Sequence, residues 1–236
     1  MMLRSKWGAA LGVLALMVAV ASPMSVGAQE SILDDASRPD GERQRDAGSK
    51  PLEVYAFWGV EPGMTVLDLM PGGGYNTYIL SNVVGNYGKV YTGPDRENRE
   101  GVRRMATRLA DHPRGNVEII AGASDLAAGS LDVIVTVRNM HDVIDNAPEL
   151  LAACMAALKP GGILGVVDAR TNMDGFDSNT HRINQKTMVE MVTAAGFVLV
   201  DSSEMLANPH DDFGKWEGAS GRTATDRMVL KFQKKN

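Results

Sequence analysis

A short apolar segment that runs directly into three consecutive glycines constrains this chain more than any other feature. The segment Thr65–Leu69 is apolar apart from Thr65 and Asp68, and Met70-Pro71-Gly72-Gly73-Gly74 follows it. Such a run is typical of a buried parallel strand. Glycines carry no Cβ, so they let the backbone turn tightly and let a ligand approach it. A helix predicted at Tyr75–Val84 points its N-terminal N–H groups at that ligand, which predicts a nucleotide-type site in a doubly wound α/β domain.

The N-terminal 28 residues have the three-part layout of a secretory signal peptide. Arg4 and Lys6 form a positive region, Trp7–Ala21 is an unbroken stretch of apolar and small residues, and Val26-Gly27-Ala28 offers a cleavage site before Gln29. A membrane span needs about 20 apolar residues, so this stretch is short for an anchor. We therefore expect an exported, periplasmic protein that is cleaved near Ala28. An uncleaved signal that anchors the protein to the membrane is the alternative.

The chain beyond residue 28 is acidic and long enough for one domain with a sizeable core. The 236 residues carry a formal charge of -5, and without the two positive charges of Arg4 and Lys6 the charge is -7. An acidic domain without a basic stripe argues against a nucleic-acid partner. The single cysteine, Cys154, excludes an internal disulfide. We expect residues 29–50 to form a polar leader segment and residues 51–236 to form the domain.

Strand-like and helix-like segments alternate along this domain, which predicts a mainly parallel seven-stranded sheet with helices on both faces. Beyond the first strand and helix, the hydrophobic patterns predict helices at Pro51–Val60, Arg96–Asp111 and Lys186–Ala195, and strands at Lys89–Thr92, Val117–Ala121, Leu131–Val137, Ile163–Val167, Phe197–Val200 and Met228–Phe232. A polar, glycine-bearing loop joins the last two strands, so the last strand is expected to be antiparallel. A further helix is expected to start with a capping box between Asn146 and Glu149 and to stop at Lys159-Pro160-Gly161-Gly162.

Several ordered motifs carry a resemblance to a known family. The broader ones are Val66-Leu67-Asp68-Leu69-Met70-Pro71-Gly72-Gly73-Gly74, Leu131-Asp132-Val133-Ile134-Val135, Leu158-Lys159-Pro160-Gly161-Gly162 and Ala194-Ala195-Gly196-Phe197. Through them the chain resembles the class I S-adenosylmethionine-dependent methyltransferases from Pro51 to Lys234. Narrower motifs resemble a bacterial group of exported predicted methyltransferases: Pro71-Gly72-Gly73-Gly74-Tyr75, Arg138-Asn139-Met140-His141-Asp142, His181-Arg182-Ile183, Asn208-Pro209-His210-Asp211-Asp212 and Thr225-Asp226-Arg227. The resemblance implies a Rossmann-like methyltransferase fold, S-adenosyl-L-methionine as cofactor, and methyl transfer to a small-molecule or surface acceptor.

The resemblance also implies which residues hold the cofactor, and these residues follow the first four strands: Asp68, Gly72, Gly73, Gly74, Asp95, Gly122, Ala123, Asp125 and Asn139. Asp68 is expected near the ammonium group of the cofactor, or else is a strand-end carboxylate satisfied by nearby N–H groups. Asp95 is expected at the ribose hydroxyls, although it is displaced by one position and a turn residue is the alternative. Asp125 is expected to accept from the adenine amine.

The loop after the fourth strand supplies the expected catalytic residues, His141 and Asp142. Loops at the carboxyl ends of parallel strands carry ligand contacts, and histidine is suited to take a proton near neutral pH. The alternative for His141 is a hydrogen-bonded loop histidine. Other residues are expected to shape the rim of the substrate pocket: Asp168, His181, Arg182 and Trp216. A base is not obligatory, because alignment of the two reactants can supply much of the acceleration of an in-line displacement.

Other readings of the sequence stay open or are disfavoured. S-adenosylmethionine is made in the cytoplasm, so an exported, non-catalytic binding domain with a methyltransferase fold is the alternative function. A nicotinamide-dependent oxidoreductase needs G-x-G-x-x-G, and Thr77 stands where the third glycine would be. No metal site is expected, because His210, Asp211 and Asp212 lack the spacing of a closed site. The sequence leaves the oligomeric state open.

Overall fold

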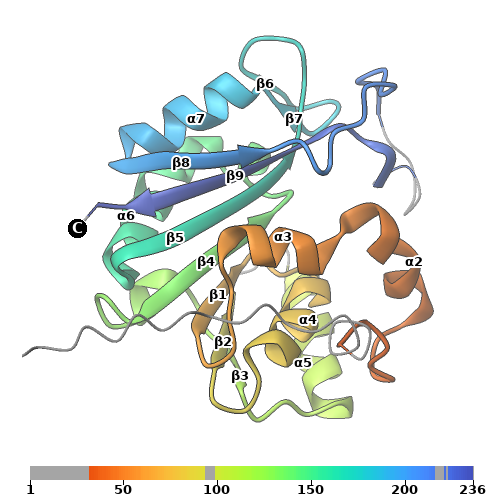
Figure 1. Cartoon of the computed structure of the whole chain (residues 1–236), viewed down its shortest axis with the longest axis vertical. Coiled ribbons are helices and arrows are strands. Elements are labelled where there is room, and N and C mark those ends of the chain that lie inside the picture. Colours follow the sequence, from red (N-terminus) through yellow and green to blue (C-terminus); the bar gives the residue numbers. More distant parts are fainter. Residues whose placement is uncertain (1–31, 94–98, 216–220, 222, 236) are drawn as a thin grey trace, which may run out of the picture.

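A seven-stranded sheet runs through the computed structural model, which describes residues 32–93, 99–215, 221 and 223–235 (Figure 1). The strands are β1 Thr65–Leu69, β2 Lys89–Thr92, β3 Val117–Ile119, β4 Leu131–Val137, β5 Leu158–Ala169, β8 Phe197–Ser203 and β9 Arg227–Lys234. Their order across the sheet is β3-β2-β1-β4-β5-β9-β8. The signal peptide expected at residues 1–28 lies outside the described residues, as do Asp95 and Trp216.

Five neighbouring strands of this sheet are parallel, and the last strand of the chain is not. The pairs β3–β2, β2–β1, β1–β4 and β4–β5 are parallel, whereas β9 is antiparallel to both β5 and β8. The predicted doubly wound sheet with an antiparallel last strand is therefore confirmed. β9 lies between β5 and β8 and does not form an edge, because the polar loop after β8 returns the chain into the gap beside β5.

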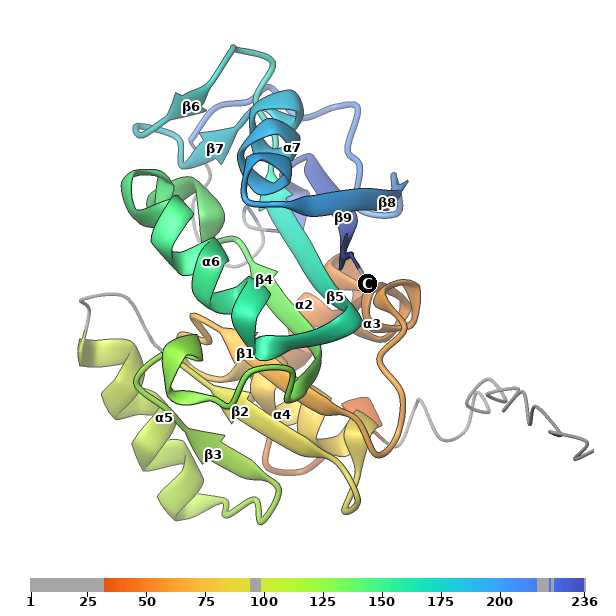
Figure 2. The same ribbon diagram turned by 90° about the vertical axis from the view of Figure 1, so that its left-hand side faces the viewer.

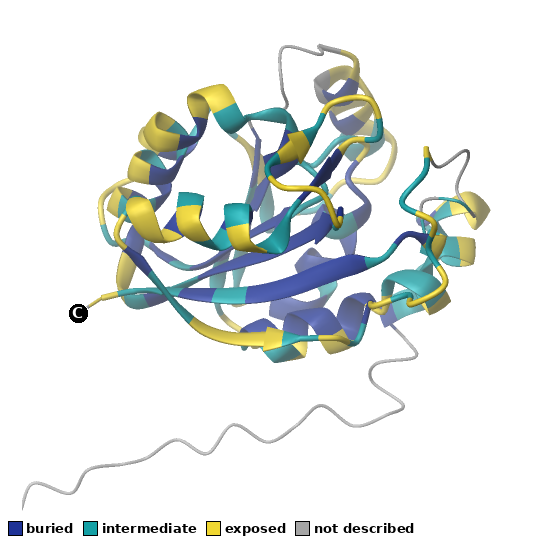
Figure 3. Cartoon of the chain, turned by 90° about the horizontal axis from the view of Figure 1, so that it is seen from above, coloured by how far each residue is buried: buried dark blue, intermediate teal, exposed yellow. Residues whose placement is uncertain are grey.

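Helices cover both faces of the sheet and bury two separate apolar layers. On one face, α3 Pro51–Trp58 and α4 Tyr75–Val84 pack with β1, β2 and β4. On the other face, α6 Ala147–Ala157 and α7 Gln185–Ala194 pack with β4, β5 and β9, and Cys154 is buried in that layer. Figure 2 shows α6 and α7 on the opposite side of the sheet from α3 and from α2, Asp40–Ser49. The central strands are buried and the outer turns of the helices are exposed (Figure 3).

Trp58 is the largest side chain in these layers, and it explains a glycine in the middle of β5. Its indole is fully buried, and its Nε1 donates to the carbonyl of Leu230 in β9 over 3.0 Å. A Cβ at Gly165 would lie 2.3 Å from the indole ring, so only glycine allows the ring to lie flat on the strand. This contact fixes α3 against β5 and β9.

Two local predictions around α6 are wrong. Asn146 makes no side-chain capping bond, because it closes the short 3-10 turn η3, Ile144–Asn146, and its backbone is not extended. The helix does end at Ala157, just before Lys159-Pro160-Gly161-Gly162, but the predicted start of the fifth strand at Ile163 is wrong, because this segment already lies within β5, which starts at Leu158. The register against β4 shifts between Leu131 and Val133, so this segment bulges out of the ladder.

A small hairpin, β6 Phe176–Asp177 and β7 Arg182–Ile183, was not predicted. Each of its strands has only two residues, which is too short for a hydrophobic pattern to reveal. The hairpin follows β5 and precedes α7, and His181 immediately precedes its second strand. None of the described helices is long and apolar enough to cross a membrane.

The described part of the polar leader, residues 29–50, packs against the domain. It contains α2, Asp40–Ser49, which has no buried residue of its own. Side-chain contacts hold it nonetheless: the Tyr75 hydroxyl donates to Asp46 over 2.7 Å, and Arg108 of α5 (Arg99–Asp111) binds Glu42 through two nitrogens at 2.6 and 3.0 Å. The leader thereby brings α2 over the carboxyl ends of the strands.

Candidate functional site

A cavity of about 550 Å³ opens where the chain order of the strands reverses, between β1 and β4. Crevices at such switch points are the usual ligand sites of open α/β sheets. The lining residues come from α2, the glycine turn, the start of α4, α5, the end of β4 and the turn after it, the β6–β7 hairpin and the loop after β8: Glu42, Arg45, Met70, Pro71, Gly72, Gly73, Tyr75, Asn76, Arg104, Val137, Arg138, Asn139, His141, Asp142, Thr180, His181 and Lys215. Six of the predicted site residues therefore lie together around this cavity: Gly72, Gly73, Asn139, His141, Asp142 and His181.

The glycine turn presents bare backbone to this cavity. A Cβ at Gly73 would meet no atom within 4 Å, so this position faces open space. Gly74 has a φ of 85°, and a Cβ there would lie 2.4 Å from the sulfur of Met105, so this glycine is needed for packing. Gly74 is also the N-cap of α4 and supplies no side-chain bond to it. Tyr75 and Asn76 at the start of α4 line the cavity, whereas the backbone N–H of Thr77 in the same turn bonds to the Asp68 carboxyl. The N-terminus of α4 thus faces the cavity with its first two residues, as anion sites at helix N-termini require.

Two side chains fasten the turn from either side. The Asn139 amide nitrogen donates to the carbonyls of Met70 and Val137 over 3.1 and 3.0 Å, which joins the end of β4 to the start of the turn. Arg108 donates to the Gly73 carbonyl over 3.1 Å while it binds Glu42. Residue 139 was predicted to bind the cofactor; in the structure it lines the cavity and positions the turn backbone.

Backbone strain is concentrated around the cavity. Met70, Arg138 and His181 have φ values of 60°, 62° and 54°, in the left-handed region that non-glycine residues rarely adopt. All three line the cavity. Strained backbone of this kind is typical of functional sites, where the surrounding contacts hold residues in place.

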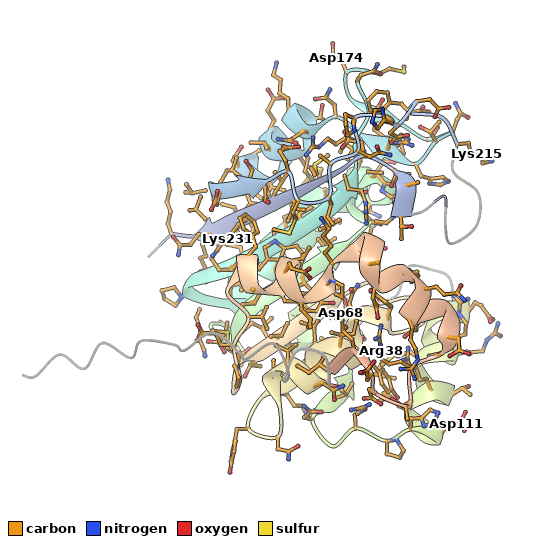
Figure 4. All side chains as sticks on the ribbon, turned by 45° about the vertical axis from the view of Figure 1, so that its right-hand side comes forward. Arg38, Asp68, Asp111, Asp174, Lys215 and Lys231 are labelled. Carbon is orange, nitrogen blue, oxygen red and sulfur yellow. The ribbon has the colours of Figure 1, made fainter. Side chains whose placement is uncertain are left out.

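Asp68 lies beneath the turn and does not line the cavity. Its side chain is buried, its Oδ2 accepts from the Thr77 hydroxyl over 2.6 Å, and its Oδ1 has no partner among the described residues. Burial raises the pKa of this carboxyl to about 7, although the Thr77 hydrogen bond opposes the rise. Figure 4 labels Asp68 in the interior, unlike Asp174 at the periphery. A buried carboxylate with an open lone pair suits a cationic ligand group, but Asp68 is not among the residues that line the cavity.

This raised pKa predicts a pH-dependent loss of stability. The folded protein holds the Asp68 proton more tightly than the unfolded chain, so this contribution is present at low pH and is lost as pH rises through about 7. Between pH 5 and 8 we expect Asp68 to lower the free energy of unfolding by about 3 kcal/mol. Urea unfolding at the two pH values should show this loss in the natural protein and not in Asp68→Asn. The exposed-residue variant Asp174→Asn is the control, and an equal pH slope in Asp68→Asn would contradict the assignment.

His141 is held from one side by a buried carboxylate. Asp168 at the end of β5 is fully buried, its Oδ1 lies 2.6 Å from His141 Nδ1, and its Oδ2 accepts from the His141 backbone N–H over 3.1 Å. The ring of Phe176 stacks on His141 with centroids 6.5 Å apart. Asp168, predicted at the pocket rim, therefore lies behind His141 and fixes the orientation of its ring.

Asp142 and His181 complete a cluster with His141 at the cavity wall. His141 Nε2 lies 3.1 Å from one carboxylate oxygen of Asp142, and His181 Nδ1 lies 2.9 Å from the other. His141 is buried, Asp142 is half-buried and His181 is half exposed. The cluster thus runs from the protein interior to the edge of the cavity.

Some predicted site residues lie elsewhere. Arg182 is buried, and its guanidinium binds Asp211 at 2.7 and 3.0 Å, so it fastens the loop after β8 and does not line the cavity. Gly122, Ala123 and Asp125 lie at the short turn η1, Ala123–Asp125, and none of them lines the cavity. The Asp125 carboxylate accepts from the backbone of Ala121 over 3.0 Å. Their expected contact with adenine stays a prediction.

The prediction missed most of the charged lining. Four basic side chains border the cavity: Arg45, Arg104, Arg138 and Lys215. Arg45 belongs to the leader and lies 4.2 Å above the ring of Tyr75. A run of leader charges is usually a solvated surface, so nothing in the local sequence marks Arg45 as part of a site. Arg138 could have been predicted as a lining residue, because it lies in the loop directly after β4.

Solved structures of known proteins resemble this architecture. A protein described as an S-adenosylmethionine-dependent methyltransferase from Aquifex aeolicus superposes with a TM-score of 0.62 at 21% identity, over 87% of this chain and 98% of its own. An arsenic(III) S-adenosylmethionine methyltransferase from Chlamydomonas reinhardtii gives 0.56 at 18% identity, over 92% and 75%. The cyclase SpnF gives 0.61 at 17% identity, over 86% and 85%. This chain has the fold of S-adenosylmethionine-dependent methyltransferases. No protein-family model and no curated protein matches the sequence.

Proposed function

We propose that this protein transfers a methyl group from S-adenosyl-L-methionine to a small polar acceptor. The observation that carries the proposal is the bare backbone at Gly73, which faces a cavity at the switch point of a methyltransferase fold. The solved structures of this fold include two that are described as S-adenosylmethionine methyltransferases, which supports the same cofactor here.

The residues present fit that cofactor. A cavity of about 550 Å³ lies in the size range of small-molecule and cofactor sites. The start of α4 offers N–H groups, and basic side chains such as Arg45 and Arg104 suit a carboxylate. The Asp68 carboxylate lies beneath the turn and does not line the cavity, so its expected contact with the ammonium group stays a prediction. Bound at the turn, the cofactor supplies an activated methyl group on a sulfonium.

The acceptor end of the cavity is the cluster of His141, Asp142 and His181. Its polar atoms can orient an attacking oxygen or nitrogen in line with the methyl group, and His141 can take the proton that the acceptor loses. Asp168 positions His141 for that task through the bond to Nδ1. The polar and charged lining favours a small polar acceptor.

The direct test is binding of S-adenosylhomocysteine to the purified protein, measured by titration calorimetry. We expect one binding site per chain, and no heat at millimolar ligand would contradict the proposal. The alternative is a non-catalytic binding domain, or another reaction on the same fold. The similarity to SpnF supports the second of these, another reaction, because SpnF has this fold and is described as a cyclase.

We also propose that the protein is exported and cleaved near Ala28. Arg4, Lys6 and the apolar stretch Trp7–Ala21 support this proposal. Mass spectrometry of the protein from its native host should find a chain that begins near Gln29. A full-length chain in the cytosolic fraction would contradict export, and it would place the protein beside the cytoplasmic supply of S-adenosylmethionine.

A further inference from the structure

Two imidazole rings and one carboxylate meet in the cluster at the cavity wall. Asp168 lies 2.6 Å from His141 Nδ1, and a carboxylate there favours a hydrogen on that nitrogen. In the neutral ring, Nε2 is then an acceptor that carries no hydrogen. It nevertheless faces a carboxylate oxygen of Asp142 at 3.1 Å, and a carboxylate is also an acceptor. The contact therefore needs either a second ring proton on Nε2 or a cation bound between the two atoms.

His181 adds a third donor atom to the same point. Its Nδ1 lies 2.9 Å from the other oxygen of Asp142, and the two imidazole rings meet edge to face with centroids 5.5 Å apart. The ligating atoms of the three side chains all lie within 4.8 Å of one another. All three residues line the cavity, so a position between them is reachable by a small ligand.

These separations are close to those of a metal site. Two ligands at 2.0–2.1 Å from a tetrahedral zinc ion are about 3.3 Å apart. The His141–Asp142 and Asp142–His181 separations of 3.1 and 2.9 Å, which involve the two different oxygens of Asp142, are slightly shorter than that, and the three ligating atoms all fit within 4.8 Å. Metal-bound histidines usually donate their other ring N–H to a carboxylate, and Asp168 holds His141 in this way. The left-handed backbone at His181, with φ 54°, fixes the third side chain in place.

We propose that His141 Nε2, the Asp142 carboxylate and His181 Nδ1 bind one divalent transition-metal ion, with zinc as the best-fitting class. Two imidazoles and one carboxylate are a donor set that zinc accepts, and they leave its fourth position open toward the cavity. Asp168 is the residue behind the site that orients His141. The proposed metal site is inferred from this geometry alone. Its use rests on the proposed methyl transfer: the ion would hold a hydroxyl-bearing acceptor and lower the pKa of that hydroxyl.

The other two histidines of the chain provide matched controls. The sequence contains four histidines. His112 and His210 are exposed, and neither is part of the cluster. The informative variant is His181→Ala, because this side chain is 49% exposed and its loss leaves the packed core intact. Asp142→Asn keeps the shape of the second ligand, and Asp168→Asn tests the residue behind the site.

The experiment is titration of the full chain, purified without a histidine tag and treated with chelator, with Zn²⁺ in a calorimeter and with Co²⁺ in a spectrophotometer. We expect one ion per chain and the visible absorption bands of tetrahedral Co²⁺. His181→Ala and Asp142→Asn should weaken Zn²⁺ binding at least 100-fold. Asp168→Asn should weaken it about 10- to 100-fold. His112→Ala and His210→Ala should bind as the unaltered chain does.

Two outcomes would overturn the metal site: no stoichiometric Zn²⁺ binding by the unaltered chain, or equal loss in His181→Ala and His210→Ala. Circular dichroism of each variant identifies any that has unfolded, and for such a variant the conservative Asp142→Asn result decides. Binding of S-adenosylhomocysteine is measured on the same samples. If zinc fails to bind and S-adenosylhomocysteine still binds, the metal site alone is wrong; if the reverse holds, the proposed methyl transfer is wrong.

Discussion

Replacing Gly73 by valine is expected to lower the affinity for S-adenosylhomocysteine at least 100-fold and to leave the fold intact. A Cβ at this position meets no protein atom within 4 Å, and Gly73 does not need a left-handed backbone. The new side chain would therefore project into the cavity without straining the protein. It would occupy the space in which a ligand lies against the turn backbone, and a 100-fold loss corresponds to about 2.7 kcal/mol.

The matched control for this substitution is Gly115→Val. Gly115 also has no atom within 4 Å of a built Cβ, but it is exposed in the loop before β3 and does not line the cavity. Calorimetric titration should give unaltered affinity for Gly115→Val and no measurable affinity for Gly73→Val. Thermal unfolding without ligand should agree between the two variants. If Gly73→Val bound the ligand normally, the glycine turn would not be the cofactor site.

The features that could be predicted from the sequence are those encoded over short stretches. β1, the glycine turn and α4 follow one another within 20 residues, Thr65 to Val84, so strand pattern, glycines and helix pattern all point to the same structure. The antiparallel last strand followed from the character of a single loop. In each case the residues that determine the local structure are close in sequence to the residues that form it.

The features that were missed depend on contacts between distant segments. His181 reaches Asp142 across 39 residues of sequence, through a hairpin of two-residue strands that has no detectable pattern. His210, Asp211 and Asp212, by contrast, are adjacent in the chain and are easily noticed in the sequence. In the structure, Asp211 binds Arg182. The buried position of Asp168 behind His141 likewise follows from the parallel pairing of β4 and β5. Spacing along the chain therefore does not reveal that His141, Asp142 and His181 lie together.

Replacing His141 by alanine is expected to lower the turnover of methyl transfer 100- to 10,000-fold. Whether His141 takes the acceptor proton or holds a metal ion that polarises the acceptor, the variant removes the group that faces the attacking atom. This loss corresponds to about 3–5 kcal/mol in the activation free energy. The affinity for S-adenosylhomocysteine should change little, because the glycine turn is held by Asn139 and Arg108 and not by His141.

Turnover can be measured as the transfer of label from radiolabelled S-adenosylmethionine to a small-molecule extract of the native host. His112→Ala is the control, since this histidine is exposed and is not one of the lining residues. His141 is only 4% exposed and stacks on Phe176, so loss of packing is the competing explanation for reduced activity. A role in packing alone would lower the melting temperature and the cofactor affinity together. A role at the acceptor lowers turnover while cofactor affinity is kept, and addition of chelator to the unaltered protein then separates the metal ligand from the proton acceptor. Full turnover by His141→Ala would remove this residue from the mechanism and leave alignment of the two reactants as the source of the acceleration.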